Sequence, residues 1–143
     1  KNFKGIESYP IDPSWRIEAR FEKYAPPKQI PITNVLGQTE PQPCPGAIVF
    51  EVGGKSYRLE PSLEGDDPDL FVIFGDATNR TTTYGAGRFL YTAPPGPDGK
   101  VIIDFNKAYN PPCAFTEFAT CPLPPPQNWM PVRVEAGEKR YGH

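Results

Sequence analysis

The stretch from residue 104 to residue 121, DFNKAYNPPCAFTEFATC, concentrates carboxylate, amide, phenol and thiol groups on one short segment. Two consecutive prolines fix two φ angles directly before Cys113, so this thiol is delivered with little conformational freedom. A loop that has already lost this entropy is suited to preorganised recognition of a ligand. We therefore expect a binding site at this loop, with Asn106, Tyr109 and Asn110 orienting the ligand.

A glycine-bearing strand, TYGAGR at residues 83–88, precedes this loop and supplies a cation. The planar fork of Arg88 can hold a carboxylate or a phosphate through two parallel hydrogen bonds. This predicts a pocket for a small anionic molecule between the strand and the loop, with Tyr84 as a further contact. The alternative for Arg88 is an internal ion pair with Asp104 or Glu135. The tyrosines of both segments are also typical core residues whose hydroxyl groups are hydrogen-bonded.

Cys113 and Cys121 leave three interpretations open: buried small side chains, a disulfide over a short loop, or a nucleophile at Cys113. The single histidine of the chain, His143, is terminal, which removes the usual cysteine–histidine pair and weakens any zinc site. Asp104 is the other catalytic candidate, as a general base, although an aspartate at a strand end more often accepts hydrogen bonds from the following turn. No metal site is predicted.

The length and composition limit the number of domains, the classes of partner and the cellular compartment. A chain of 143 residues predicts a single domain, with an irregular arm over 1–14 and a tail over 140–143. A net charge of -2 argues against a nucleic-acid partner, and no apolar run reaches the ~18 residues of a membrane span. Three cysteines favour a reducing, cytoplasmic compartment. Because Lys1 is not a start residue, a removed secretion or lipoprotein signal stays open. The oligomeric state is not fixed by these features.

Apolar and polar residues alternate over 15–22, which predicts a strand; a short helix over Ser14–Ala19 is the alternative. The Ala25-Pro26-Pro27 sequence is expected to end that strand. A second strand over 30–36 is limited to an edge by its proline, and 38–45 is expected to be a loop. The strongest local signal is AIVFEV-GG-KSYRLEP, a hairpin turning at Gly53 and Gly54.

Four further strands are predicted over 70–74, 81–92, 101–105 and 131–135, the first of them buried on both faces. The acidic stretch from Glu60 to Asp69 lacks the spacing of an EF-hand loop and is expected to be a solvated turn. With 20 prolines and 13 glycines, the chain is predicted to be mainly β: a compact barrel or sandwich of about seven to nine short strands with long proline-rich loops.

The motifs DATN, TYGAGRFLY, DFNKAYNPPCAF, CPLPPP and EAGEK together resemble a bacterial and archaeal family of uncharacterised proteins, domain of unknown function 1684. The resemblance runs from about Phe3 to Lys139. It implies no activity, and the cofactor, if any, is unknown. It points to nine characteristic polar positions: Arg88, Asp104, Asn106, Tyr109, Asn110, Cys113, Cys121, Glu135 and Lys139.

Three hypotheses on function follow. The first is a domain that binds a small anionic molecule through Arg88. The second is an enzyme that uses Cys113 or Asp104, with a flavin on a split barrel as one form of it by analogy of fold alone. The third is a structural or interaction module whose polar residues brace long loops. A ligand site requires Arg88 to be at least partly unpaired, whereas complete internal pairing favours bracing.

Overall fold

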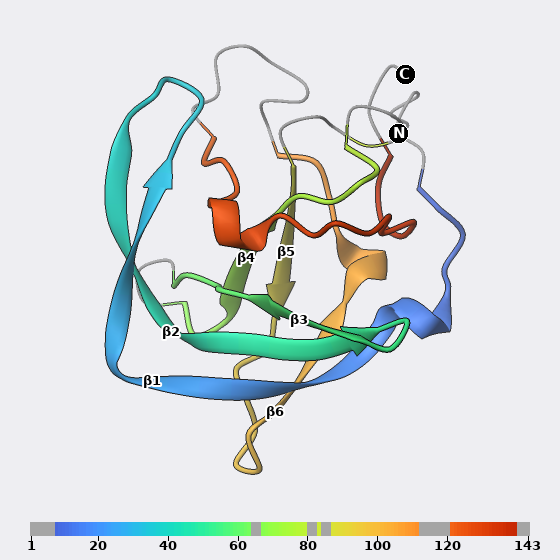
Figure 1. Cartoon of the computed structure of the whole chain (residues 1–143), viewed down its shortest axis with the longest axis horizontal. Coiled ribbons are helices and arrows are strands. Elements are labelled where there is room, and N and C mark those ends of the chain that lie inside the picture. Colours follow the sequence, from blue (N-terminus) through green and yellow to red (C-terminus); the bar gives the residue numbers. More distant parts are fainter. Residues whose placement is uncertain (1–7, 64–66, 80–82, 84–86, 112–120, 140–143) are drawn as a thin grey trace.

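The computed structural model describes residues 8–63, 67–79, 83, 87–111 and 121–139. Its strands are β1 (Arg16–Thr33), β2 (Thr39–Val52), β3 (Lys55–Leu59), β4 (Leu70–Phe74), β5 (Arg88–Thr92) and β6 (Lys100–Asp104). They form a four-stranded antiparallel sheet in the order β3-β2-β1-β6 and a two-stranded sheet, β4-β5. The described helical turns are the 3-10 segments η1 (Pro13–Trp15), η2 (Phe105–Lys107) and η4 (Pro126–Asn128). The fold is mostly β, as expected, and the larger sheet curls into a half-barrel (Figure 1).

The predicted strand over 15–22 is confirmed as the first part of β1. Ala19 is buried and its neighbours Glu18 and Arg20 are exposed, as period-two alternation requires. The helical alternative survives only as the single turn η1. Asp12 caps this turn, because its Oδ1 accepts a hydrogen bond from the Ser14 amide at 3.0 Å.

The predicted break at Ala25-Pro26-Pro27 is wrong. β1 continues to Thr33, and its pairing with β2 shifts register between Lys23 and Lys28. The prolines occupy this β-bulge, where the ladder requires no amide donor, and so the strand bends without ending. The loop expected over 38–45 is accordingly wrong from Thr39 onward, where β2 begins. The second half of β1 is an edge, as predicted, because β6 pairs only with Arg16–Arg20.

The Gly53-Gly54 hairpin is confirmed as the turn between β2 and β3. Val52 pairs with Lys55, and the two glycines have φ angles of 61° and 83°. Both values lie in the left-handed region that a two-residue turn between twisted strands demands.

The core has two parts, and β4 separates them. All five residues of β4 are buried, as its continuous apolar sequence predicts. One part fills the half-barrel; among its fully buried members are Ile48, Leu59, Val72, Phe74, Leu90, Ile103 and Phe105. The other contains Ile30, Ile32, Cys44, Phe71, Ile73, Phe89 and Cys121. The β1–β2 ribbon belongs to both, so the bulge is where it passes from one face of β4 to the other (Figure 1).

The strand predicted over 131–135 is wrong, since these residues are irregular. Buried side chains replace a partner strand here: the Val134 amide donates to Asp76, and Arg88 donates to the Val134 carbonyl. Of the strand predicted over 81–92, Arg88–Thr92 form β5, and Thr83 forms an isolated bridge with Asn79. At Gly87, a Cβ would lie 2.7 Å from the Phe74 carbonyl oxygen, so the close backbone approach expected of this glycine-bearing segment is found there.

Candidate functional site

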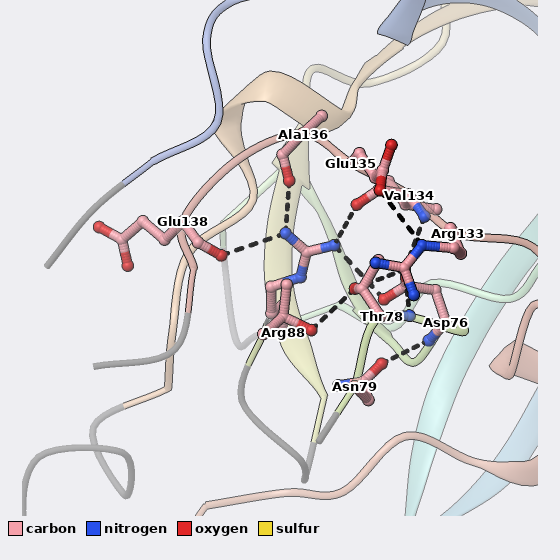
Figure 2. A network of polar contacts seen from close by, with 10 residues as sticks. Asp76, Thr78, Asn79, Arg88, Arg133, Val134, Glu135, Ala136 and Glu138 are labelled. Carbon is pink, nitrogen blue, oxygen red and sulfur yellow. Dashed lines mark hydrogen bonds and ion pairs between the residues drawn. The ribbon is translucent and has the colours of Figure 1, made fainter. Parts of the chain in front are cut away.

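Arg88 begins β5, and its side chain is fully buried. Figure 2 shows its guanidinium surrounded by acceptors from the C-terminal segment. Nη1 donates to the carbonyls of Ala136 and Glu138, and Nη2 donates to the Val134 carbonyl at 3.0 Å and to Asp76 Oδ1 at 3.4 Å. These contacts engage both Nη atoms, whereas Nε has no partner among the described residues, so the ligand contact of Arg88 stays a prediction.

Asp76 is the acidic partner of Arg88, where the sequence suggested Asp104 or Glu135. Its Oδ2 accepts three hydrogen bonds, from the Thr78 amide and hydroxyl and from the Val134 amide. Burial lowers the pKa of Arg88 although Asp76 opposes that shift, and an arginine so placed remains charged. The pair fastens the segment around residue 134 to the loop that follows β4.

The polar residues of the 104–111 region are also engaged internally. Asp104 Oδ1 accepts from the amide of Asn106 at 3.1 Å and from its Nδ2 at 2.9 Å, which is the capping role weighed against a general base. The Asn106 side chain in turn bonds both the amide and the carbonyl of Asp12, and so holds the N-terminal arm. Tyr109 pairs with Phe89 in an antiparallel bridge.

Asn110 is buried and donates its amide to Glu138 Oε1 and its Nδ2 to the Lys139 carbonyl. The structure thus brings Asn110 next to the C-terminal segment that Arg88 also contacts. The predicted site residues Tyr84 and Cys113 lie outside the described residues, as does the pairing of Cys113. Cys121 is buried in the second part of the core.

A second polar group lies where β1 bends, and sequence reasoning missed it. It consists of Tyr24 in the bulge, Lys28 directly after it, Arg58 on β3, Glu60 one residue beyond β3, and Gln127 in η4. We call this the Glu60 cluster. A bulge redirects side chains, and here it turns Tyr24 and Lys28 toward the end of β3.

Glu60 is the centre of the cluster. Its carboxylate accepts four contacts: from the Tyr24 hydroxyl at 2.6 Å, from Gln127 Nε2 at 2.8 Å, and from Lys28 Nζ at 3.0 and 3.3 Å to its two oxygens. Asn128 fixes the backbone of Glu60, accepting from its amide and donating to its carbonyl. The solvated turn predicted to begin at residue 60 is therefore wrong for Glu60, whose exposure is only 6%.

Arg58 extends the network toward solvent. Its Nη2 donates to the Tyr24 hydroxyl at 2.9 Å, and its Nη1 donates to Glu22. Lys28 and Arg58 lie 5.9 and 5.7 Å from the centre of the Tyr24 ring, within the range of cation–π attraction. The two cations are thus held by one phenol and two carboxylates.

The electrostatics of the cluster fix its protonation states. Burial alone would raise the pKa of Glu60, but hydrogen bonds from Tyr24, Lys28 and Gln127 outweigh burial and hold the pKa below its usual value. The bond to Glu60 raises the pKa of Lys28. Burial, and then the bond to Glu60, raises the pKa of Tyr24. At neutral pH the cluster therefore presents a carboxylate, an ammonium and a protonated phenol. Such perturbed groups beside a cleft are typical of functional sites.

The cluster faces an open pocket of about 560 Å³, lined by Lys28, Ile30, Pro31, Arg58, Glu60 and Gln127. Another depression, of about 610 Å³, lies at the end of the half-barrel near Phe21 and Leu63 and is mainly apolar. A third pocket, of about 490 Å³, is lined by exposed charged side chains, among them Glu18, Arg20 and Lys100. Of these three pockets in the described part of the chain, the first is the one whose lining includes a buried charged group, Glu60. Within the described ranges, no group of histidine, cysteine or acidic residues is arranged to hold a metal ion. The described part of the chain also contains no helix long and apolar enough to span a membrane.

The sequence offered one signal for this cluster, the pair Pro26-Pro27 inside an alternating strand. This pair predicts the end of a strand, whereas the structure shows a bulge that reorients the side chains on either side of it. Nothing in the local sequence distinguishes Glu60 from the acidic residues after it, because its burial comes from Gln127 and Asn128, far along the chain.

Comparison with known proteins adds a fold and a family. The chain is similar to the uncharacterized protein from gene locus rrnAC0354 of Haloarcula marismortui, whose solution NMR structure matches with a TM-score of 0.77 and 31% identity. The match covers 96% of this chain and 77% of that one. A search of curated proteins gives no match. The model of a family described as "Protein of unknown function (DUF1684)" matches residues 1–139. The chain therefore belongs to the DUF1684 family, as its motifs indicated.

Proposed function

We propose that the protein binds a small anionic molecule, and that the ligand occupies the pocket of the Glu60 cluster. The class of function is the one inferred from the sequence, but the cations that serve it are Lys28 and Arg58 instead of Arg88. The observation that carries the proposal is that both side chains are fixed by internal partners while about half of each remains exposed, 54% and 47%.

The spare donors of these cations support the proposal. Lys28 Nζ has three hydrogens and, among the described residues, its hydrogen bonds go to the two oxygens of Glu60. Arg58 has five N–H groups and uses one for Tyr24 and one for Glu22. Because their partners already hold these long side chains, a ligand loses less conformational entropy when it binds to them than it would with free side chains. Glu60 itself is saturated, and so it positions the donors and does not touch the ligand.

The charge balance narrows the ligand class. Lys28 and Arg58 carry two positive charges, and Glu22 and Glu60 carry two negative ones. A dianion such as a phosphate monoester would meet this neutral group with unfavourable excess charge, whereas a carboxylate can share the spare N–H groups at lower cost. The pocket wall formed by Ile30 and Pro31 adds an apolar surface. The proposed ligand is thus a monocarboxylate with a small apolar body.

Titration with propionate, followed by NMR, tests this proposal. We expect propionate to shift the Arg58 Nε–H and Gln127 side-chain signals in a saturable way. Replacing either cation, as in Lys28→Gln or Arg58→Gln, should weaken binding at least about tenfold, since one charge-assisted hydrogen bond corresponds to roughly 1.4 kcal/mol or more. Inorganic phosphate should bind more weakly than propionate.

Arg133→Gln is the matched control. Arg133 forms a surface ion pair with Glu135, and 46% of its side chain is exposed, close to the value for Arg58. The control should bind propionate as the wild type does. Equal shifts at every exposed cation, or unchanged binding by the Lys28→Gln, Arg58→Gln double variant, would show that the pocket is not an anion site.

A further inference from the structure

Two buried polar atoms have no hydrogen-bond partner in the part of the chain that the structure describes: Arg88 Nε and Asn110 Oδ1. Both side chains are enclosed, with exposures of 0% and 3%. In Figure 2 the dashed lines from the guanidinium begin at its two Nη atoms and none begins at Nε. Buried donors and acceptors are nearly always paired, with protein or with an ordered molecule, so each of these two atoms calls for a partner.

The backbone register sets the two residues side by side. Phe89 and Tyr109 exchange both of their amide–carbonyl hydrogen bonds, each 2.9 Å long, in an antiparallel bridge. The next pair along this register is Arg88 and Asn110, a non-hydrogen-bonded pair whose side chains emerge on the same face, roughly 5 Å apart at Cβ. Both residues also contact Glu138, Arg88 at its carbonyl and Asn110 at its carboxylate.

The chemistry of these atoms is complementary and unambiguous. Arginine Nε carries a hydrogen at any pH the protein meets, so it can only donate. The Asn110 amide is oriented by its Nδ2, which donates to the Lys139 carbonyl at 3.0 Å, so Oδ1 can only accept. An occupant must therefore accept from one and donate to the other. A fully deprotonated anion such as a carboxylate offers no proton to Oδ1, and a cation is repelled by the guanidinium. A neutral hydroxyl meets both demands.

We propose that Arg88 and Asn110 form a buried site for one water molecule, which accepts from Arg88 Nε and donates to Asn110 Oδ1. Buried waters typically make about three hydrogen bonds to polar groups that otherwise lack partners. This inference goes beyond the anion pocket and is independent of it. In this site Arg88 binds a neutral molecule through Nε. Its positive charge is already compensated by Asp76 and by the carbonyls of the C-terminal segment.

Water-selective NMR on the intact wild-type chain tests the site. We expect a cross-peak between a long-lived water and both the Arg88 Nε–H and the Asn110 Nδ2 protons. Asn128 is the internal control, because it is equally buried and all its polar atoms are engaged, with Glu60 and Ile73. Its side-chain protons should show no such cross-peak. Inorganic phosphate should leave the Arg88 Nε–H signal unshifted, whereas an anion site would respond.

One variant and one structure complete the test. In Asn110→Asp, a carboxylate can pair directly with the guanidinium, and the water cross-peak at Arg88 should be lost. A high-resolution crystal structure of the wild type should show a single water within hydrogen-bond distance of both atoms. A direct Arg88–Asn110 hydrogen bond, an anion at this position, or a water signal as strong at Asn128 as at Asn110 would each overturn the proposal.

Discussion

The Arg88–Asp76 pair and the Lys28–Glu60 pair each join a cation to a carboxylate, but their surroundings differ. In the first, neither side chain has exposed surface. In the second, Glu60 is enclosed while 54% of the Lys28 side chain is exposed. The first cation lies among the backbone carbonyls of the C-terminal segment, and the second lies at the edge of a pocket. Desolvation therefore dominates the energetics of the first pair, and solvent screens the second.

We take this difference in exposure to distinguish a structural role for Arg88 from the binding role proposed for Lys28 and Arg58. The Nη atoms of Arg88 donate to three carbonyls of the irregular C-terminal segment and to Asp76 in the loop after β4. The side chain thus supplies hydrogen bonds that a neighbouring strand would otherwise provide. Lys28 and Arg58 are about half exposed, so solvent screens their ion pairs, and the binding role proposed for them uses N–H groups beyond those given to Glu60, Tyr24 and Glu22. A buried arginine after glycines is thus compatible with a structural role, and the exposed pair is the better place for a ligand.

The comparison predicts its largest effect for Arg88→Met. This change leaves Asp76 buried without its counter-charge and leaves the carbonyls of the C-terminal segment without donors. We expect the free energy of unfolding to fall by about 3–5 kcal/mol, as found when one partner of a buried ion pair is removed. Urea denaturation measures this. Arg133→Met, which removes an exposed ion pair, should cost less than about 1 kcal/mol. Equal losses in the two variants would show that the buried pair is not a brace.

Cys44, which pairs with Lys28 of the Glu60 cluster across the β1–β2 ladder, should produce the next largest effect, at alkaline pH. Cys44 is fully buried, and burial raises its pKa from 9.0 to about 11. Between these values the unfolded chain releases the thiol proton and the folded chain retains it. Stability should therefore fall as pH rises from 9 to 11, by at most about 2–3 kcal/mol, since each unit of pKa difference is worth about 1.4 kcal/mol.

Cys44→Ala provides the control for this pH dependence. The variant should lose less stability than the wild type over the same interval, whatever its stability at neutral pH. Tyr24, whose pKa is also raised, contributes to the alkaline loss in both proteins and so cancels in the difference. Parallel curves for the two proteins would mean that water reaches the Cys44 thiol and that burial does not raise its pKa.

The sequence predicted local features of this fold well. The Gly53-Gly54 hairpin and the buried strand at residues 70–74 follow from turn chemistry and from apolar runs, which are properties of neighbouring residues. The continuity of β1 through Pro26 and Pro27 was missed, because a proline pair has the same local signature whether a strand ends or bulges. What distinguishes a bulge from the end of a strand is the pairing with β2, which resumes at Lys28 and Cys44.

The site was harder to predict for the same reason. Arg88 was expected to be important, and it is the largest of the fully buried side chains. Its partner Asp76 follows a different strand, and of the three carbonyls that it bonds only that of Val134 lies in the segment predicted to be a strand. In the Glu60 cluster, Tyr24 and Gln127 are about a hundred residues apart in the sequence. Chemistry that depends on such long-range contacts leaves no spacing pattern to detect.

A smaller effect is expected for Glu60→Gln at neutral pH. The variant loses the charge that receives bonds from Tyr24 and Lys28, and we expect a loss of about 2 kcal/mol in the free energy of unfolding. Because the folded-state pKa of Glu60 lies below its ordinary value of 4.5, its contribution is complete above that pH and disappears as the pH falls through the folded-state value. The difference between the two proteins should therefore shrink in acid. A difference independent of pH would contradict a charged Glu60.

The smallest effect on stability should come from Lys28→Gln, and this would sharpen the comparison most. Glu60 keeps its bonds from Tyr24 and Gln127 in this variant, and the lysine is half-exposed, so we expect a loss below about 1 kcal/mol. Propionate binding should nevertheless fall about tenfold or more. The combination of an intact fold and lost binding distinguishes a ligand-contacting cation from a brace. If Lys28→Gln instead unfolds as easily as Arg88→Met, the Glu60 cluster is a second brace, and the difference between the two ion pairs is one of exposure alone.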